Sequence, residues 1–260
     1  MPPTGEPPSR STSEPQPRRM AMIALFTDFG WQGPYVGQLK ARLATLAPEV
    51  TTIDLMHDAP AFDPRASAYL LAALLPFLPP DAIVCAVVDP GVGGVRPPVI
   101  ARLDDRALIG PGNGLFEIAR RGAARAEFRQ IADIPETLSA SFHGRDLFAP
   151  VAAALATGKE VKTAPLAEAL PGADWPDMLA EVIYIDGYGN AITGLAGDRL
   201  EETALLAGGR RLRRARTFSD CLPGEPFWYV NSIGLVEIAV NRGSAADLLD
   251  LDIGSQVARA

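Results

Sequence analysis

Short apolar runs recur along the first part of the chain, and helical patterns lie between them. Strands are predicted at 22–26, 50–55 and 83–88, and helices at 34–46 and 64–75. The first and third of these runs read MIALF and IVCAVV, with no polar residue on either face. Strands that are apolar throughout are buried on both faces, which is typical of a parallel sheet covered by helices. We therefore expect an N-terminal α/β domain with a mainly parallel sheet.

The pattern changes after about residue 160. Further strands are predicted at 98–103, 107–109 and 126–131, and a helix at 146–157, which extends the α/β domain over residues 21–160. Residues 161–178 are rich in Pro, Gly and Ala without periodicity and are interpreted as a linker. Beyond them, short β-rich segments punctuated by glycine predict a smaller all-β, barrel-like domain over residues 179–260. A cleft between two such domains is a natural ligand site.

The charge and the cysteine content of the chain argue against several classes of binding partner and metal site. The chain has 24 Lys and Arg against 31 Asp and Glu, a net charge of −7, which argues against general nucleic-acid binding. No apolar run approaches the roughly 18 residues that a membrane span needs. Cys85 and Cys221 lie far apart and form no CxxC pair, which favours a reducing, cytoplasmic setting and no thiolate metal site. Residues 1–20 lack the apolar core of a signal peptide and are expected to be a disordered leader.

Three turn-rich loops follow predicted strands of the α/β domain. They are Thr27–Gly30, Asp89–Gly93 and Gly110–Gly114. Open parallel sheets bind ligands outside the carboxyl ends of their strands, so these loops are expected to share one edge. The alternative is that their glycines and prolines only make turns. None matches GxGxxG or a P-loop, so the sequence gives little support for dinucleotide or nucleoside triphosphate binding.

The two histidines stand in different contexts. His143, in FHGRD, precedes a predicted helix and has a glycine beside it that lets a ligand approach the backbone. Its imidazole can accept a proton near neutral pH, so both a catalytic and a structural role are open. His57, in LMHDAPAF, is interpreted as structural. Two glycine-containing stretches of the β domain, 186–190 and 231–234, are typical of ordinary turns. The arginines of segment 210–216 are expected at the surface, with an anionic partner as the alternative.

Taken in order, these segments resemble the S-adenosylmethionine (SAM) hydroxide adenosyltransferases, relatives of the SAM-dependent fluorinase and chlorinase. The matching stretches read TDFG, VDPGVGGVR, PGNGLF, SFHGRDLFAP, IDGYGNAIT and NSIGLVEIAVNRGSAA, between about residues 23 and 249. The resemblance implies an N-terminal α/β domain, a C-terminal β-barrel and a homotrimer. It also implies that SAM binds where the N-terminal domain of one subunit meets the C-terminal domain of a neighbour.

The resemblance implies an Asp–Arg–His catalytic set, which in this sequence is Asp89, Arg96 and His143. Fluorinase-like members carry an aromatic residue in place of Asp89, so its presence favours water over halide. The substrate contacts that the resemblance implies are Asp28 at the ribose diol, Phe142 and Gly144 beside the reacting C5′ carbon, Asp186 and Ser232 at the methionine group, and Asn190 and Phe218 at the adenine.

The expected reaction converts SAM and water to adenosine and methionine. His143 would take or share the proton of the water, Asp89 would orient the imidazole or the water, and Arg96 would stabilise the developing anion, with the identity of the base left open. No metal or other cofactor is expected. A SAM-dependent halogenase shares the fold and the ligand, whereas a SAM or adenosine sensor would bind without turnover. A metal-dependent hydrolase built on Asp28, Asp89 and His143 would leave the β domain without a role.

Overall fold

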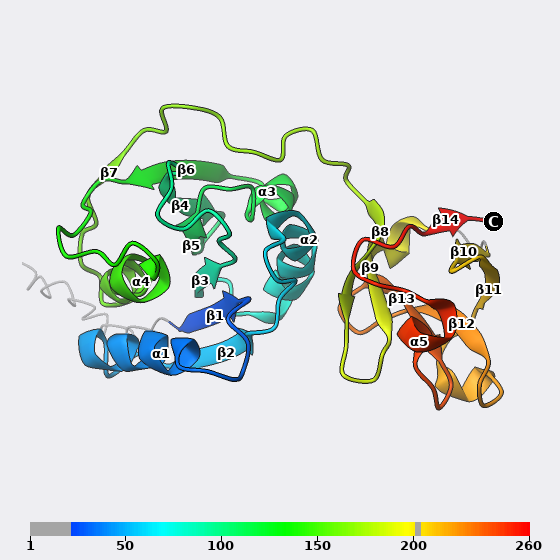
Figure 1. Ribbon diagram of the computed structural model, residues 1–260. Coiled ribbons are helices and arrows are strands. Elements are labelled where there is room, and N and C mark those ends of the chain that lie inside the picture. The colour runs from blue at the N-terminus through cyan, green and yellow to red at the C-terminus, as the bar shows by residue number, and fades with distance from the viewer. Residues whose placement is uncertain (1–21, 201–203) are drawn as a thin grey trace, which may run out of the picture.

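The computed structural model describes residues 22–200 and 204–260, and their strands form two seven-stranded sheets (Figure 1). The leader predicted over residues 1–20 lies outside the described residues. No helix in the described part of the chain is long and apolar enough to cross a membrane.

The N-terminal sheet is mixed, which corrects the prediction of a mainly parallel sheet. Its strand order is β2-β1-β3-β5-β4-β6-β7. Strands β2, β1, β3 and β5 run parallel, whereas β4, β6 and β7 add three antiparallel pairings. The strands are β1 (Ile23–Thr27), β2 (Thr52–Met56), β3 (Ile83–Val87), β4 (Pro98–Leu103), β5 (Arg106–Pro111), β6 (Ala126–Ile131) and β7 (Thr163–Ala164).

A short hairpin explains the difference. Only Asp104 and Asp105 connect β4 to β5, and Asp104 has a φ of 53°, in the left-handed region that tight hairpins use. Two residues can join antiparallel neighbours only, because a parallel pair needs a long crossover. The prediction of the strands was correct here, but the direction of the pairing was not.

Helices cover both faces of this sheet. Helices α1 (Tyr35–Leu46) and α4 (Ala149–Ala156) pack on the face that carries Ile23 and Leu25. Helix α2 (Pro64–Leu74), followed by η1 (Leu75–Phe77), packs with α3 (Glu117–Gly122) on the face of Ala24 and Phe26, the side nearer the C-terminal sheet (Figure 1). All residues of β1 and β3 are buried, as their apolar sequences predicted.

The single helix predicted at 146–157 is instead two elements. A π-helical turn, η2 (Gly144–Phe148), starts directly after His143 and leads into α4. π-Turns within helices occur frequently at functional sites. The turn therefore marks the segment that the sequence had singled out for its histidine.

The C-terminal strands form a sheet that is nearly closed into a barrel. Its order is β14-β10-β11-β12-β13-β9-β8. Strand β14 pairs with β10 at one edge, and just before it Val257 donates a backbone hydrogen bond to Ala180 of β8 at the other (2.9 Å). The strands are β8 (Leu179–Ile185), β9 (Ala191–Ala196), β10 (Leu205–Ala207), β11 (Arg210–Arg214), β12 (Pro226–Val230), β13 (Leu235–Val240) and β14 (Ala258–Arg259).

Three short helical elements make this domain less purely β than predicted. They are η3 (Gly197–Arg199), η4 (Phe218–Asp220) and α5 (Ala245–Leu249). Helix α5 is capped by Ser244, whose hydroxyl accepts a hydrogen bond from the backbone of Asp247. Helices of one turn leave too little periodicity for the sequence to indicate them.

The two domains contact each other through α2 and the start of the barrel. Leu179 and Ile183 of β8 belong to the same buried cluster as the inner face of α2. At the rim, the Tyr184 hydroxyl donates to Asp58 (2.8 Å) and Arg65 faces Glu181 (3.6 Å). The C-terminal domain is therefore docked by apolar packing with a polar margin.

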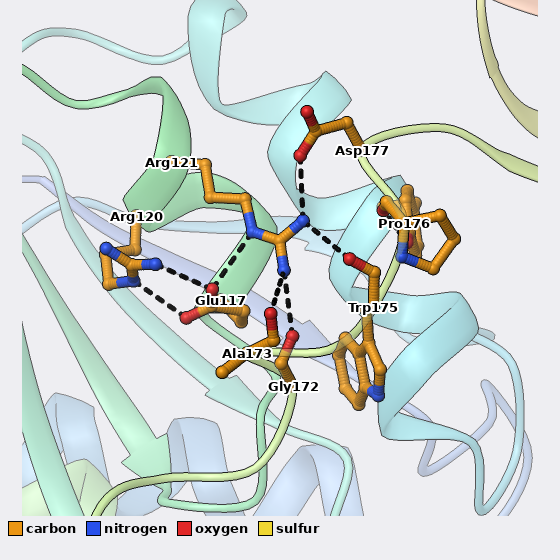
Figure 2. A network of polar contacts seen from close by, with 9 residues as sticks. Glu117, Arg120, Arg121, Gly172, Ala173, Trp175, Pro176 and Asp177 are labelled. Atoms are coloured by element: carbon orange, nitrogen blue, oxygen red, sulfur yellow. Dashed lines mark hydrogen bonds and ion pairs between the residues drawn. The ribbon is translucent and has the colours of Figure 1, made fainter.

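The chain between the domains is anchored by Arg121 (Figure 2). Its guanidinium donates to the carbonyls of Gly172 (2.8 Å) and Trp175 (2.8 Å) and to the carboxylate of Asp177 (2.9 Å), while Nε donates to Glu117 (3.0 Å). Neighbouring Arg120 contacts only Glu117 in this network. One side chain of α3 thus fixes a stretch that has no regular secondary structure of its own.

We expect Arg121→Met to lower the free energy of unfolding by about 2–3 kcal/mol, because several hydrogen bonds from one charged group are lost together. It should also speed proteolytic cleavage between residues 165 and 178. Arg120→Met is the matched control and should change stability by about 0.5 kcal/mol or less, as for an exposed ion pair. Denaturant unfolding and limited proteolysis test both variants, and equal effects would contradict the anchoring role of Arg121.

Candidate active site

The three loops predicted to share an edge do so. Strands β1, β3 and β5 are parallel neighbours, so the loops that follow them all leave the same edge of the sheet. The side chain of Asn113, in the third loop, donates to the carbonyl of Val88 at the start of the second (2.9 Å). Open α/β sheets bind ligands at this carboxyl edge of their strands.

Asp89, Arg96 and His143 form one hydrogen-bonded group at this edge. Arg96 binds both carboxylate oxygens of Asp89, through Nε (2.9 Å) and through Nη2. The same Nη2 lies 2.9 Å from Nδ1 of His143, which is 47 residues away in the sequence. The side chains of Asp89 and Arg96 are only 5% and 11% exposed, and His143 is 8% exposed. Low exposure strengthens each of these electrostatic contacts.

This geometry assigns the proton on His143. A guanidinium can only donate hydrogen bonds, so Nδ1 of His143 must accept from Arg96, and the ring proton of the neutral imidazole is on Nε2. Burial and the positive charge of Arg96 lower the pKa of His143 below its ordinary value of 6.5. The imidazole is therefore neutral around pH 7 and offers an Nε2–H donor to a ligand.

Close backbone packing holds the Arg96 loop against the His143 loop. Gly93 has a φ of 78°, and a Cβ there would lie 2.5 Å from the carbonyl oxygen of Ala140. On the other side, Arg145 binds both carboxylate oxygens of Asp146 and donates to Gln38 of α1 (2.6 Å). The segment that carries His143 is thus fixed from two directions.

Aromatic side chains form a wall beside the histidine. The Phe142 ring packs edge-on against Phe29 and Tyr35, with centroids 5.5 and 5.4 Å away. A Cβ on Gly144 would lie 3.1 Å from Phe29 and 3.2 Å from Phe142. Phe142 and Gly144, both predicted as contacts of the reacting carbon, therefore sit with Phe29 in one tight group.

Asp28 lies in the loop after β1. Its carboxylate accepts a hydrogen bond from the backbone N–H of Phe62 (3.1 Å). Burial is the main reason that the pKa of Asp28 is raised, and the negative charge of nearby Asp89 adds to it. The two carboxylates follow neighbouring parallel strands, so their loops leave the same edge of the sheet.

The residues predicted in the C-terminal domain form two loops of their own. Asp186 accepts from the backbone N–H groups of Tyr188 (2.8 Å) and Asn190 (2.9 Å) and from the Asn190 side chain (2.9 Å). Ser232 is exposed in the turn between β12 and β13. Phe218 packs edge-on against Phe227 and Tyr229. Among the described residues, Asp89, Arg96 and His143 hydrogen-bond to one another and not to these side chains.

Several supporting residues were missed from the sequence. Glu237 is 5% exposed and binds the Tyr229 hydroxyl (2.5 Å) and the side chain of Asn231 (2.9 Å), so it connects the aromatic cluster of Phe218 to the turn of Ser232. Its charge in the middle of the apolar strand LVEIAV was a signal that could have indicated it. The hydrogen bond from the backbone N–H of Phe62 to Asp28 left no such signal, because it does not depend on the side chain.

The described residues contain no group of three or more His, Cys, Asp and Glu side chains arranged to hold a metal ion. Asp28, Asp89 and His143, the set of the metal-hydrolase alternative, are therefore not arranged as such a cluster.

Comparisons with known proteins agree with this architecture. The family model described as the SAM hydroxide adenosyltransferase N-terminal domain matches residues 23–164, and that of the C-terminal domain matches residues 180–258. A protein of Thermus thermophilus named (R)-S-adenosyl-L-methionine hydrolase is 42% identical over 92% of this chain and 99% of its own. One of the same name from Salinispora arenicola is 38% identical over 90% and 96%.

More distant relatives include a fluorinase from Actinopolyspora mzabensis, 22% identical over 91% of this chain and 96% of its own. A solved structure of an uncharacterized conserved protein from Thermotoga maritima superposes with a TM-score of 0.81 at 28% identity, covering 91% of this chain and 98% of that one. With both family models matched in order over nearly all of the described residues, this chain belongs to the SAM hydroxide adenosyltransferase family.

Proposed function

We propose that this protein is a SAM hydrolase, which converts SAM and water to adenosine, L-methionine and a proton. The observation that carries the proposal is the contiguous Asp89–Arg96–His143 group at the carboxyl edge of the sheet. The relatives named as hydrolases, at 38–42% identity, support the same reaction, and the relative named as a fluorinase is more distant.

The chemistry explains why such a group suffices. The sulfonium of SAM leaves C5′ as neutral methionine, so the leaving group needs no acid. The difficulty is the nucleophile, because bulk water has a pKa near 15.7. The enzyme must hold one water in line behind C5′, opposite sulfur, and stabilise it as its proton departs. Holding the reactants in this geometry can supply roughly 7–11 kcal/mol of the barrier reduction.

We assign the roles from the hydrogen bonds. His143, with Nδ1 occupied by Arg96, presents Nε2–H to the attacking oxygen and orients it. Arg96 places a fixed positive charge beside the hydroxide that develops. The Asp89 carboxylate keeps a free lone pair on each oxygen and is the member of the set that can accept the water proton. As the carbon–oxygen bond forms, the carbon–sulfur bond breaks and its electron pair goes to sulfur.

We further propose that the site is completed by a neighbouring subunit of a homotrimer in the cytoplasm. The residues assigned to the ribose and the reacting carbon lie in the N-terminal domain, whereas Asp186, Asn190, Phe218 and Ser232 lie in the barrel. Exposed aromatic side chains flank both groups, and Phe62 and Tyr188 are 78% and 83% exposed. Large exposed aromatic side chains support an interaction surface. The two unpaired cysteines, Cys85 and Cys221, support a reducing compartment.

Incubation with SAM in ¹⁸O-labelled water tests the reaction directly. We expect the label in the 5′-hydroxyl of adenosine, measured by mass spectrometry, and the same rate with EDTA present. Chloride and fluoride are added in parallel reactions. A 5′-halo-adenosine would identify a halogenase, tight binding without product would identify a sensor, and rescue by a divalent ion after EDTA would overturn the metal-free scheme.

Two substitutions separate the proposed roles. His143→Ala should lower kcat by about 10²–10⁴-fold with little change in SAM affinity, since it removes a group that acts on the nucleophile. Asp28→Ala should mainly raise the Kd for SAM, by about 10- to 100-fold, as expected for losing charged hydrogen bonds. Calorimetric Kd values and steady-state rates measure both. Similar losses of binding in the two variants would be inconsistent with these roles.

The pKa of His143 can be measured by NMR, because the chain has two histidines and their ring signals are easily told apart. We expect the His143 ring, followed by NMR, to titrate below 6.5, so that the neutral form persists into mildly acidic solution. Arg96→Met removes the neighbouring positive charge and should raise that pKa. The two signals are assigned with His57→Gln. A pKa above 6.5 in the unmodified protein would contradict the assigned contact with Arg96.

A further inference from the structure

A second polar network contacts the loop Thr27–Gly30, which carries Asp28, and includes none of Asp89, Arg96 and His143. His57 is completely buried, with Nδ1 2.8 Å from the Thr27 hydroxyl and Nε2 3.1 Å from Asp54. The other Asp54 oxygen accepts from Lys40 of α1 (2.7 Å). Lys40 is 42% exposed and Asp54 24%, so the network runs from the surface to the core.

The partners determine the direction of the hydrogen bonds that Asp54 receives. Lys40 can only donate, and ionised Asp54 can only accept, so His57 donates from Nε2. Burial raises the pKa of Asp54, but Lys40 and His57 outweigh it and hold that pKa below its usual value, which keeps the carboxylate ionised. In a neutral imidazole that donates from Nε2, Nδ1 of His57 accepts from the Thr27 hydroxyl. The Thr27 oxygen in turn accepts from the backbone N–H of Phe29 (3.3 Å).

The network ends on both sides of Asp28. Thr27 precedes it and Phe29 follows it, and the hydroxyl of the first holds the backbone N–H of the second. The loop after β2 reinforces this, because Gly30 donates to the carbonyl of His57 (2.6 Å) and Ala59 to that of Thr27 (3.1 Å). The Trp31 ring packs edge-on over His57, with centroids 4.9 Å apart.

We propose that His57 is a positioning residue for the substrate: with Asp54 and Lys40 it fixes the Thr27 hydroxyl, and thereby sets the Asp28 carboxylate and the Phe29 ring. This inference rests on the proposed role of Asp28 in binding SAM. An unpaired buried hydroxyl or imidazole is costly, so the network has one stable arrangement and holds the loop before substrate arrives. Preorganisation of this kind lowers the cost of binding.

Thr27→Val removes the hydroxyl while keeping the shape of the side chain. We expect the KM for SAM to rise about tenfold with kcat changed less than threefold. The binding loop loses one hydrogen bond that holds it in place, and a single hydrogen bond has an effect of about this size. Thr27→Ser keeps the hydroxyl and should restore KM to within about twofold. Loss of kcat alone, or a serine variant as poor as valine, would overturn the proposal.

Thr193 supplies a matched control in the barrel. It is also completely buried, its hydroxyl donates to the carbonyl of Val236 (2.9 Å), and it accepts from the backbone N–H two residues on (3.3 Å). Thr193→Val should lower the melting temperature as Thr27→Val does, while KM stays unchanged. Equal effects of both variants on KM would mean that Thr27 acts only through stability.

A surface variant covers the case in which Thr27→Val does not fold. Lys40→Met breaks the outer end of the network and should raise KM about threefold, whereas Arg120→Met, from a similarly exposed ion pair, should not. A KM unchanged in Lys40→Met would contradict the proposal.

NMR of ¹⁵N-labelled histidine gives a readout that does not depend on turnover. We expect His57 to be protonated at Nε2 and unprotonated at Nδ1, and a proton on Nδ1 would reverse the order of the network and overturn the proposal. If the wild-type enzyme formed no adenosine, the proposed function would fail, yet calorimetric SAM binding by the same variants would still test the positioning role.

Discussion

The contact of one guanidinium with both a carboxylate and an imidazole underlies the whole site. Arg96 binds Asp89 with two nitrogens and shares one of them with His143. Its guanidinium also lies over the ring of Phe148 in the π-turn, with Cζ 5.5 Å from the ring centroid. A lysine could supply the charge but not the planar fork that meets two partners at once. The orientation of the imidazole, the ring nitrogen that carries its proton and the positive charge beside it all follow from this one side chain.

Helix α1 supports both the segment of His143 and the loop of Asp28. Gln38 accepts from Arg145, which stabilises the segment of His143, and Lys40 contacts Asp54, which leads to the loop of Asp28. The apolar residues of the same helix, Leu39 and Leu43, are buried against the sheet. One helix therefore ties both segments to the same core, because its buried face cannot shift without disturbing that core.

Local pattern was sufficient to predict the strands and the shared edge. Apolar runs located β1 and β3, and the loop after each leaves the edge that the sequence indicated. Strand direction depends on which partner each strand meets, and the tight turn at Asp104 decided it for β4. The α-helical period also could not indicate the extra residue in the π-turn after His143.

Predicting the Asp89–Arg96–His143 group required more than local pattern. Arg96 and His143 are 47 residues apart, and it was the family resemblance that joined them with Asp89. The contacts that hold the site residues in place are even harder to predict from the sequence. The backbone N–H that holds Asp28 comes from Phe62, and any residue type could supply it. The buried network of His57 was interpreted as structural because a single sequence does not show which side chains meet it.

The half-buried carboxylate of Asp28 also bears on how the proposed catalytic cycle could end. Its negative charge is poorly solvated and is repelled by that of Asp89. A sulfonium is a cation, and its arrival would offset both penalties. In the proposed reaction the carbon–sulfur bond breaks, sulfur becomes uncharged, and the positive charge passes to the proton that Asp89 accepts. If Asp28 binds the substrate as proposed, its attraction to the charge on sulfur would be lost in the reaction, and this loss would favour departure of the products.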